Sequence, residues 1–446
     1  MKSMNRTLGI VVGCAVLFAT SFALAQDWPQ WRGPNRDGKA TGFKAPATWP
    51  KELKQQWQVT VGQGDGGPVV VGDKVFIFGR QGGDEVLACL NITDGKEVWK
   101  DKYPVAAIQG PDAREHSGPR STPAVADGKI VTQGVTGVLS CYDLAGKMAW
   151  RKEEFTKSFP RFHVASSPII VDGMCVAQLG GGNDGATIAF DLGSGTEKWK
   201  WTGEGPGYAS PVLMTIDGTQ VLITQTDRSV VAINAADGKG MWQVAFAPQG
   251  MGYNASTPAV NGTTLIYAGQ GRGVKAVQFS KDGEKLAAKD LWTNTDNSPQ
   301  FNSLVLKDGL LYGIAQNGRF FCINAQDGKT AWTGGGPAGG GGRGPMGAAG
   351  MSGQPILAAG GMGGGRGGRG GGMGGGAGYG SIIDAGAVLM ALTPASDLII
   401  FQPGDKQYTE VAKIKVASTP VYAYPALCGN RLLVKDREML TMWVIE

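Results

Sequence analysis

Short apolar runs recur along most of the chain, and Gly, Asp and Asn separate them. In a clear copy, apolar pairs at 124–125 and 130–131 flank the turn Asp127-Gly128, and the run 138–142 alternates apolar with polar residues. Alternation with a period of two predicts short strands, and Asp-Gly turns are typical of hairpins. The pattern therefore predicts an all-β protein, and it contains no amphipathic helix longer than a turn or two.

These strands repeat as a four-stranded unit. Most copies begin with Ser/Thr-Pro, and most end in a Gly-containing turn followed by a strand that carries one Trp. The first strands are anchored at Pro68, Pro123, Pro168, Pro211, Pro258, Leu304, Ile382 and Pro425, with successive gaps of 55, 45, 43, 47, 46, 78 and 43 residues. A β-repeat of this length is the signature of a propeller blade, so eight anchors predict an eight-bladed β-propeller.

The last repeat supplies three strands and stops at Glu446. Residues 56–59, which include Trp57, read as a strand before the first full repeat. We expect this N-terminal strand to complete the last blade and close the ring, which leaves no open sheet edge. The predicted organisation is a signal peptide at 1–25, an N-terminal extension at 26–55 and a propeller at 56–446.

The first residues have the features of an export signal. Lys2 and Arg6 precede an apolar run at 8–19, and small residues at 23–25 form a cleavage site. That run is too short to span a membrane, and no later segment is long enough. We expect an exported monomer without a transmembrane span, located in the periplasm, at the cell surface or in the medium.

Residues 333–380 interrupt the repeat. They are rich in Gly, include Arg343, Arg366 and Arg369, and contain no acidic residue. Such a segment buries too little apolar surface to offset its ordering entropy, so it is predicted to be a disordered insertion. It is either a tolerated loop or a basic tether for an acidic surface or cell-wall polymer.

Charge and cysteine content exclude several functions. The net charge is +5 and the basic residues are scattered, which argues against nucleic-acid binding. Cys89, Cys141 and Cys322 hold the same place in three repeats, too far apart for disulfides, so free buried cysteines are expected. No Cys-x-x-Cys or His-paired cluster is present, and no metal site is predicted.

The Trp-bearing strands resemble a known family. Residues 89–99 match the small-x-Asp-x-x-Thr-Gly-Lys-x-x-Trp docking motif of the quinoprotein alcohol dehydrogenase-like superfamily, and 189–199, 232–242 and 322–332 follow the same spacing. Residues 27–38 resemble the opening of exported PQQ-binding-like β-propeller repeat proteins, a group that includes BamB-like outer-membrane assembly propellers. The resemblance implies structural Trp docking between blades by Trp57, Trp99, Trp150, Trp199, Trp242, Trp292 and Trp332.

The resemblance to this family implies two alternative functions. Quinoprotein dehydrogenases hold pyrroloquinoline quinone (PQQ) between a Trp and a disulfide of adjacent cysteines, with Ca²⁺ on Glu and Asn and a catalytic Asp. This chain has no adjacent cysteine pair, and we find no matching ligand set. We therefore expect no cofactor and no catalysis: the chain is predicted to be a non-catalytic binding or assembly scaffold of the cell envelope. The alternative is a PQQ-dependent oxidoreductase with its cofactor in the central funnel.

Candidate binding residues gather in the loops that join one blade to the next, which lead to the mouth of the central channel. Both histidines and several arginines of the chain lie there. Such donors and the nearby aromatic rings suit an anionic small molecule, a glycan or a peptide tail. A second hypothesis for binding is an envelope protein partner at a blade edge or face, as in the outer-membrane assembly propellers. The alternative is that these side chains cap strand ends and bond neighbouring loops. The predicted ligand-binding set is Arg114, His116, Arg120, Arg161, His163, Tyr208, Tyr253, Asn254 and Asn302.

Overall fold

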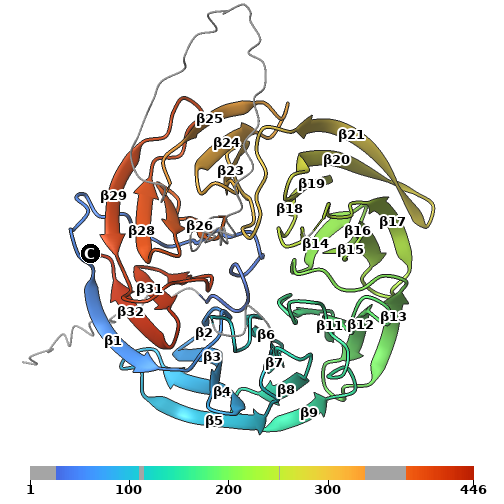
Figure 1. The fold of residues 1–446 in the computed structure, drawn as a ribbon, viewed down its shortest axis with the longest axis horizontal. Helices are drawn as coiled ribbons and strands as arrows, with labels where there is room; N and C mark the ends of the chain where they lie inside the picture. Colours follow the sequence, from blue (N-terminus) through green and yellow to red (C-terminus); the bar gives the residue numbers. More distant parts are fainter. Residues whose placement is uncertain (1–26, 110–114, 251, 337–377) are drawn as a thin grey trace, which may run out of the picture.

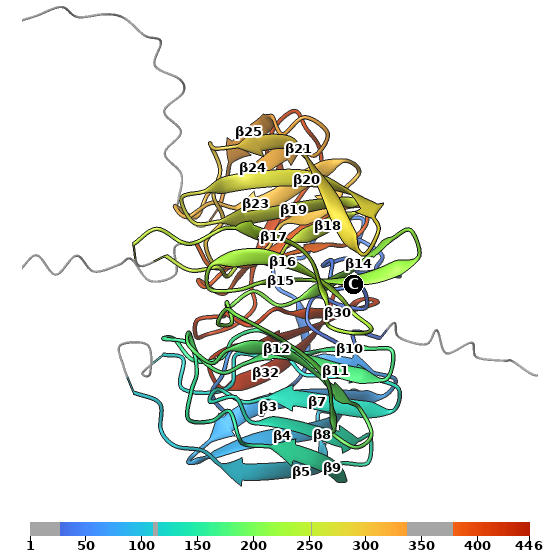
Figure 2. The same cartoon turned by 90° about the vertical axis from the view of Figure 1, so that its right-hand side faces the viewer.

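The computed structural model describes residues 27–109, 115–250, 252–336 and 378–446, which form a ring of eight four-stranded antiparallel sheets (Figure 1). This confirms the predicted eight-bladed β-propeller. The predicted signal peptide and most of the predicted Gly-rich insertion lie outside the described residues. The predicted start of the insertion at 333 is wrong, because Thr333 and Gly334 still belong to strand β25 (Thr330–Gly334) and pair with β24. Figure 2 shows the ring from its edge: the strands run between two opposite faces, so the connecting loops gather on those faces.

Seven blades each use four consecutive strands. Blades 1 and 2 are β2 (Val69–Val71), β3 (Lys74–Gln81), β4 (Asp84–Asn91), β5 (Glu97–Pro104), and β6 (Ala124–Ala126), β7 (Lys129–Gln133), β8 (Leu139–Asp143), β9 (Met148–Lys152). Blades 3 and 4 are β10 (Ile169–Val171), β11 (Met174–Leu179), β12 (Ala186–Asp191), β13 (Glu197–Thr202), and β14 (Val212–Ile216), β15 (Thr219–Gln225), β16 (Ser229–Asn234), β17 (Gly240–Ala245). Blade 5 is β18 (Ala259–Asn261), β19 (Thr264–Gly269), β20 (Gly273–Asp282) and β21 (Lys285–Asn294). Blades 6 and 7 are β22 (Val305–Lys307), β23 (Leu310–Ile314), β24 (Phe320–Asn324), β25 (Thr330–Gly334), and β26 (Ser381–Asp384), β27 (Leu389–Leu392), β28 (Asp397–Phe401), β29 (Glu410–Lys415).

Blade 8 combines the two ends of the chain. Its inner strands are β30 (Ala426–Cys428), β31 (Arg431–Lys435) and β32 (Met439–Val444), and its outer strand is β1 (Lys54–Thr60). β1 pairs antiparallel with β32 from Lys54 opposite Val444 to Thr60 opposite Met439. The N-terminal strand therefore completes the last blade, as predicted.

Tryptophan side chains dock most blades onto their neighbours. Where the pattern is complete, the indole lies over a glycine in the outer turn of the next blade: a Cβ on Gly95 would lie 2.8 Å from Trp57, and one on Gly238 would lie 2.7 Å from Trp199. The glycines are required because any side chain there would displace the ring. Six indole N–H groups also donate to a carbonyl of the next blade: Trp57 to Ile92 (2.8 Å), Trp99 to Leu144 (3.2 Å), Trp150 to Leu192 (3.0 Å), Trp199 to Ala235 (3.0 Å), Trp292 to Ala325 (2.9 Å) and Trp332 to Gly404 (2.8 Å).

Three junctions depart from this pattern. Trp332 bonds the Gly404 carbonyl, but a Cβ on Gly404 would meet no atom within 4 Å, so this glycine does not lie beneath the indole. Trp242 meets Phe279 edge to face at 4.9 Å, because β20 and β21 extend as ten-residue strands where other blades turn. In β29, Ala412 holds the register position of the Trp. The neighbouring blade 8 has no turn between β32 and β1 to receive an indole, since these strands belong to opposite ends of the chain.

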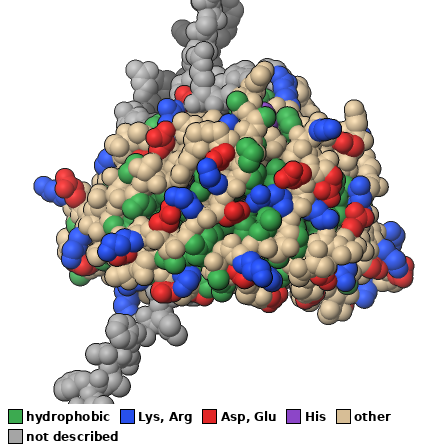
Figure 3. Space-filling view, turned by 90° about the horizontal axis from the view of Figure 1, so that it is seen from below, with side chains coloured by type: hydrophobic (Ala, Val, Ile, Leu, Met, Phe, Trp, Pro, Cys, Tyr) green, Lys and Arg blue, Asp and Glu red, His purple; other side chains and the backbone are tan. Residues whose placement is uncertain are grey.

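The cysteines and the charged surface agree with the sequence analysis. The five cysteines of the described residues are free and buried. On the side of the ring shown in Figure 3, Lys and Arg alternate with Asp and Glu and form no patch of one sign. Among the described residues, no helix is long and apolar enough to cross a membrane.

The N-terminal extension enters the centre of the ring (Figure 1). Trp28 exchanges backbone hydrogen bonds with Val70 of blade 1, and the Val125 N–H of blade 2 donates to Pro29. Further along the extension, the Ala40 N–H donates to the Asp384 carbonyl of blade 7, and the Asp384 N–H donates to the Gly38 carbonyl. The extension therefore bonds the inner strands of blades on different sides of the channel.

Two buried arginines hold this extension in place. The Arg36 guanidinium donates to the carbonyls of Ser167 (3.0 Å) and Pro168 (2.8 Å) in blade 3, and Arg32 donates to Leu304 (2.6 Å) at blade 6. Burial and the nearby Arg32 charge lower the pKa of Arg36 to about 9. The terminal nitrogens of both guanidinium groups bond backbone carbonyls of the ring rather than carboxylates, so we call the extension the plug of the channel.

The glycine beneath a docking indole can be tested with a matched pair in blade 4. Gly238 (φ +75°) lies under Trp199, whereas a Cβ on Gly218 (φ +74°) would meet no atom within 4 Å. We expect Gly218→Ala to lower the free energy of unfolding by about 1 kcal/mol, through backbone strain alone. Gly238→Ala should lower it by about 1–3 kcal/mol more, because the added methyl group also overpacks the contact with Trp199. Denaturant unfolding measures both, and equal losses would contradict the docking role.

Candidate functional site

A cavity of about 920 Å³ opens on the axis of the ring, and we call it the cup. Every blade-to-blade loop contributes to it at the third position before its strand anchor. These eight residues are Asp65, Arg120, Ala165, Tyr208, Ala255, Phe301, Tyr379 and Tyr422, and all of them line the cup. The repeat therefore brings one side chain from each of eight distant loops to a common rim.

Aromatic rings form a collar around this rim. The collar consists of His116, Phe162, Tyr208, Tyr253, Phe301, Tyr379 and Tyr422. Successive rings touch: Phe162 and Tyr253 at 4.9 Å, Tyr208 and Tyr253 at 5.9 Å, Tyr253 and Phe301 at 5.8 Å, Phe301 and Tyr379 at 4.2 Å, Tyr379 and Tyr422 at 5.1 Å, and Tyr422 and His116 at 4.7 Å. Arg120 closes the remaining gap, because its guanidinium donates to the carbonyls of Phe162 and His116.

A belt of hydroxyl groups lies at the position before the anchors of blades 2 to 6. Backbone N–H groups donate across the blades, from Gly67 to Thr122 Oγ1 (2.9 Å), Thr122 to Ser167 Oγ (3.0 Å), Ser167 to Ser210 Oγ (2.9 Å), Ser210 to Thr257 Oγ1 (2.9 Å) and Thr257 to Ser303 Oγ (3.0 Å). This belt explains why Ser or Thr precedes Pro in the repeat. Each hydroxyl accepts one bond and keeps its own proton as a donor.

The N-terminal plug forms the floor of the cup. Trp31 and Tyr424 both line the cavity, and their rings lie 6.0 Å apart. Beneath them, Arg32 and Arg36 are 1% and 3% exposed. The cup is therefore open at the collar and closed below.

Charged lining residues occupy one sector, where blades 8, 1 and 2 meet. The His116 Nδ1 lies 2.7 Å from Asp65 Oδ2, and their side chains are only 15% and 19% exposed. Behind them, the buried Lys435 ammonium donates to the carbonyls of Gly64 and Asp436. Burial lowers the pKa of Lys435 to about 8, although the Asp65 charge acts in the opposite direction. The other described residues that line the cup have uncharged side chains.

Five of the predicted binding residues line the cup: His116, Arg120, Tyr208, Tyr253 and Asn302. Asn302 also supports the wall, since its amide donates to the Ile314 carbonyl at 2.6 Å and accepts from the Ile314 N–H at 3.0 Å. Binding of a ligand by these residues stays a prediction.

The other predicted residues lie elsewhere. Arg161 is exposed, with its guanidinium 5.2 Å from the centre of the Phe162 ring. His163 has φ +63° and is buried against Phe159, with ring centres 4.7 Å apart. Asn254 is buried and donates to the carbonyls of Thr226 (2.8 Å) and Phe246 (3.0 Å), so it joins loops. Arg114 lies outside the described residues.

Several lining residues were missed from the sequence. They are Trp31, Asp65, Gln270, Gln300, Gln316, Tyr379 and Tyr422. The search followed charge and histidine, but the informative signal was positional: counting three residues back from each anchor finds Asp65, Tyr379 and Tyr422 directly.

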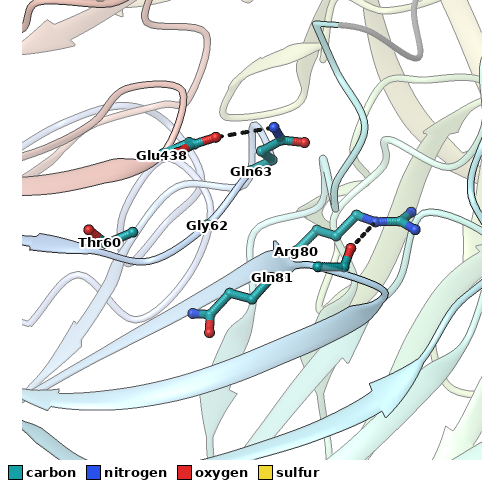
Figure 4. A pocket seen from close by; sticks show the side chains of 7 residues that line it. Thr60, Gly62, Gln63, Arg80, Gln81 and Glu438 are labelled. Atoms are coloured by element: carbon teal, nitrogen blue, oxygen red, sulfur yellow. Dashed lines mark hydrogen bonds between the residues drawn. The ribbon is translucent and has the colours of Figure 1, made fainter.

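A second, smaller pocket of about 500 Å³ lies at the seam between blades 8 and 1 (Figure 4). Gln63 Nε2 donates to Glu438 Oε1 at 3.1 Å, and Arg80 Nε donates to the Gly82 carbonyl at 3.2 Å. These polar groups satisfy one another, which is the pattern of a structural seam.

The lining of the cup does not fit PQQ. A tricarboxylate quinone requires several free cationic donors. Arg120 is the single arginine of the described lining, and its guanidinium bonds backbone carbonyls, while Asp65 and Glu115 add negative charge. The described cysteines are dispersed over separate blades, and no group of three or more His, Cys, Asp or Glu among the described residues could hold a metal ion.

Comparison with known proteins identifies the family. The family model described as "Outer membrane protein assembly factor BamB" matches residues 49–183 and 85–334. The chain belongs to this family. It is 22% identical over 293 residues to the BamB of Bordetella pertussis, covering 63% of this chain and 68% of the relative. It is 26% identical over 208 residues to the BamB of Burkholderia pseudomallei, covering 45% of this chain and 48% of the relative.

Solved structures share the fold. The BamB of Moraxella catarrhalis superposes with a TM-score of 0.59 and 14% identity, covering 88% of this chain and 99% of that chain. The quinohemoprotein alcohol dehydrogenase of Comamonas testosteroni superposes with a TM-score of 0.62 and 13% identity, covering 95% of this chain and 81% of that chain. At such identities these similarities concern the propeller fold alone.

The buried Lys435 generates a pH prediction. The unfolded chain binds the proton with a pKa of 10.5, and the folded protein with a pKa of about 8. Between these values the unfolded state holds more protons, so the free energy of unfolding attributable to Lys435 rises with pH, by at most about 1.4 kcal/mol per unit. Denaturant unfolding at pH 7 and pH 9.5 should show a larger rise for the parent than for Lys435→Met. An identical pH dependence of the two proteins would contradict this assignment.

Proposed function

We propose that this protein is an exported, non-catalytic binding scaffold of the cell envelope that acts in outer-membrane assembly, and that the cup is its binding site. Membership of the BamB family supports the envelope role. The observation that carries the proposal is the aromatic collar around a closed-bottomed cup: rings from seven separate loops converge on one cavity. Concave sites rich in aromatic side chains with a few polar groups are typical of ligand binding.

The collar lies apart from the contacts that dock the blades. The docking indoles lie in the outer strands, whereas the collar rings come from loops at the mouth. Aromatic side chains that remain partly exposed at the rim, such as Tyr208 and Phe162, are available for contact with a partner. Their convergence therefore supports recognition rather than packing.

A PQQ-dependent oxidoreductase is the competing function, favoured by the propeller shared with quinohemoprotein alcohol dehydrogenases. The lining argues against it, as described above. On titration with PQQ and Ca²⁺, we expect no stoichiometric uptake of the quinone by absorbance and no reduction of an electron-accepting dye with alcohols or sugars. Stoichiometric capture with dye reduction would overturn the proposal.

Site-specific photocrosslinking locates the binding surface. A photoreactive phenylalanine analogue is placed at Tyr422 in the collar or, as the control, at Val98, which is 54% exposed on the outer strand β5. After irradiation in envelope extracts, we expect an adduct from position 422 and little from position 98, because only the former faces the cup. Intact mass then gives the adduct's size. Adducts confined to position 98, or equal at both positions, would place binding outside the cup and contradict the proposal.

A further inference from the structure

We infer that the cup binds the end of a neutral glycan. This inference rests on the proposed function of the cup as a binding site, and it names the chemical class of the ligand. Three features of the described residues lead to it. The plug already bonds backbone groups of the ring, the charged side chains of the lining have partners, and carboxamide and hydroxyl side chains also line the cup.

Some of the backbone groups around the channel are already in use. The plug takes the carbonyls of Ser167, Pro168 and Leu304 and bonds both polar groups of Val70. A peptide that binds by strand addition needs unpaired backbone groups along a strand edge. At blades 1, 3 and 6 the plug occupies such groups, so recognition by these blades depends on side chains.

The charged lining residues are also engaged. Asp65 pairs with His116, Arg120 bonds two carbonyls, and Glu115 lies 4.0 Å from Arg437. Binding of an ionised ligand in a partly buried site requires a fixed opposite charge. Because these charges already have partners, the lining favours an uncharged ligand.

The remaining polar groups suit hydroxyls. On the side of blades 4 to 6, the cup is lined by the carboxamides of Gln249, Gln270, Gln300 and Gln316. The Oε1 atom of Gln270 is buried and accepts no hydrogen bond from any described residue. A buried acceptor without a partner costs stability, and a rotation of the Gln270 side chain that exposed this oxygen to a ligand hydroxyl would recover that cost.

Hydroxyl groups and rings complete this sector. Ser210, Thr257 and Ser303 line the cup and each accept a backbone N–H, which leaves their own O–H groups as donors. A sugar hydroxyl both donates and accepts, so it can pair with carboxamides and with these donors. The neighbouring rings Tyr208, Tyr253 and Phe301 offer apolar surface for the C–H faces of a pyranose.

The shape of the cup selects a chain end. The plug closes the floor, so a long polymer cannot thread through the channel. A cavity of about 920 Å³ falls at the upper end of small-molecule sites, which suits a short oligosaccharide terminus rather than a single sugar.

Saturation-transfer NMR and calorimetry test the inference with cellotetraose, maltotetraose and chitotetraose as neutral probes. We expect saturable binding of at least one probe to the purified protein. Gln270→Leu should weaken that binding roughly tenfold through loss of a hydrogen-bonding side chain, without lowering the melting temperature, because Gln270 Oε1 has no partner to lose. A loss of binding that follows a loss of stability would instead indicate a structural role and would overturn the assignment of Gln270.

Phe301→Ala serves as a second variant and should weaken binding at least tenfold through loss of a ring at the rim. Phe159→Ala is its matched control: Phe159 is 36% exposed but does not line the cup, so binding should be unchanged. If none of the three probes binds, or if Phe301→Ala and Gln270→Leu bind as the parent does, the glycan inference is wrong. If a protein adduct still forms from position 422 in that case, the proposed function stands with a different ligand; if no adduct forms there, both fail.

Discussion

The contact of an indole with a glycine across a blade boundary is the interaction on which the rest of the structure depends. Wedge-shaped sheets arranged around an axis leave gaps at their outer edges, and a flat indole over a bare turn fills such a gap while its N–H satisfies a carbonyl. Trp57 makes this contact from β1 onto Gly95, so the strand that closes the ring also docks blade 8 onto blade 1. Only a closed ring brings eight loops to one axis, and the cup exists because of that closure.

The blade number, the closing strand and the free cysteines could all be predicted from the sequence, because each depends on spacing that repeats along the chain. Features that the repeat does not carry could not. The residues around Trp242 do not indicate that β20 and β21 continue past the usual turn. The absence of a Trp at Ala412 is explained by the structure of blade 8, whose strands β32 and β1 have no turn between them. The sequence likewise predicted an N-terminal extension but not its position in the channel, because the residues that it contacts lie far along the chain.

The residues of the candidate site could likewise be predicted only in part. A search for charge found His116 and Arg120 but also selected His163, whose positive φ turns it into the packing around Phe159. The loop between blades 2 and 3 is longer than several other blade-to-blade loops. Residues of different loops therefore need not point the same way, even when both precede an anchor. Counting from the anchors would have found Asp65, Tyr379 and Tyr422, because the anchor defines where each inner strand begins.

Repetition and asymmetry have separate roles at the cup. The hydroxyl belt follows the repeat, and its bonds link neighbouring blades in the same way from Gly67 to Ser303. The rest of the lining instead varies from loop to loop, with the Asp65–His116 hydrogen bond on one side and uncharged rings and carboxamides on the far side. A symmetric ring presents the same groups in every direction and cannot orient a ligand. The sector with Asp65, Glu115 and Arg120 breaks that symmetry, so a neutral ligand that avoids desolvating these charged groups is directed toward blades 4 to 6.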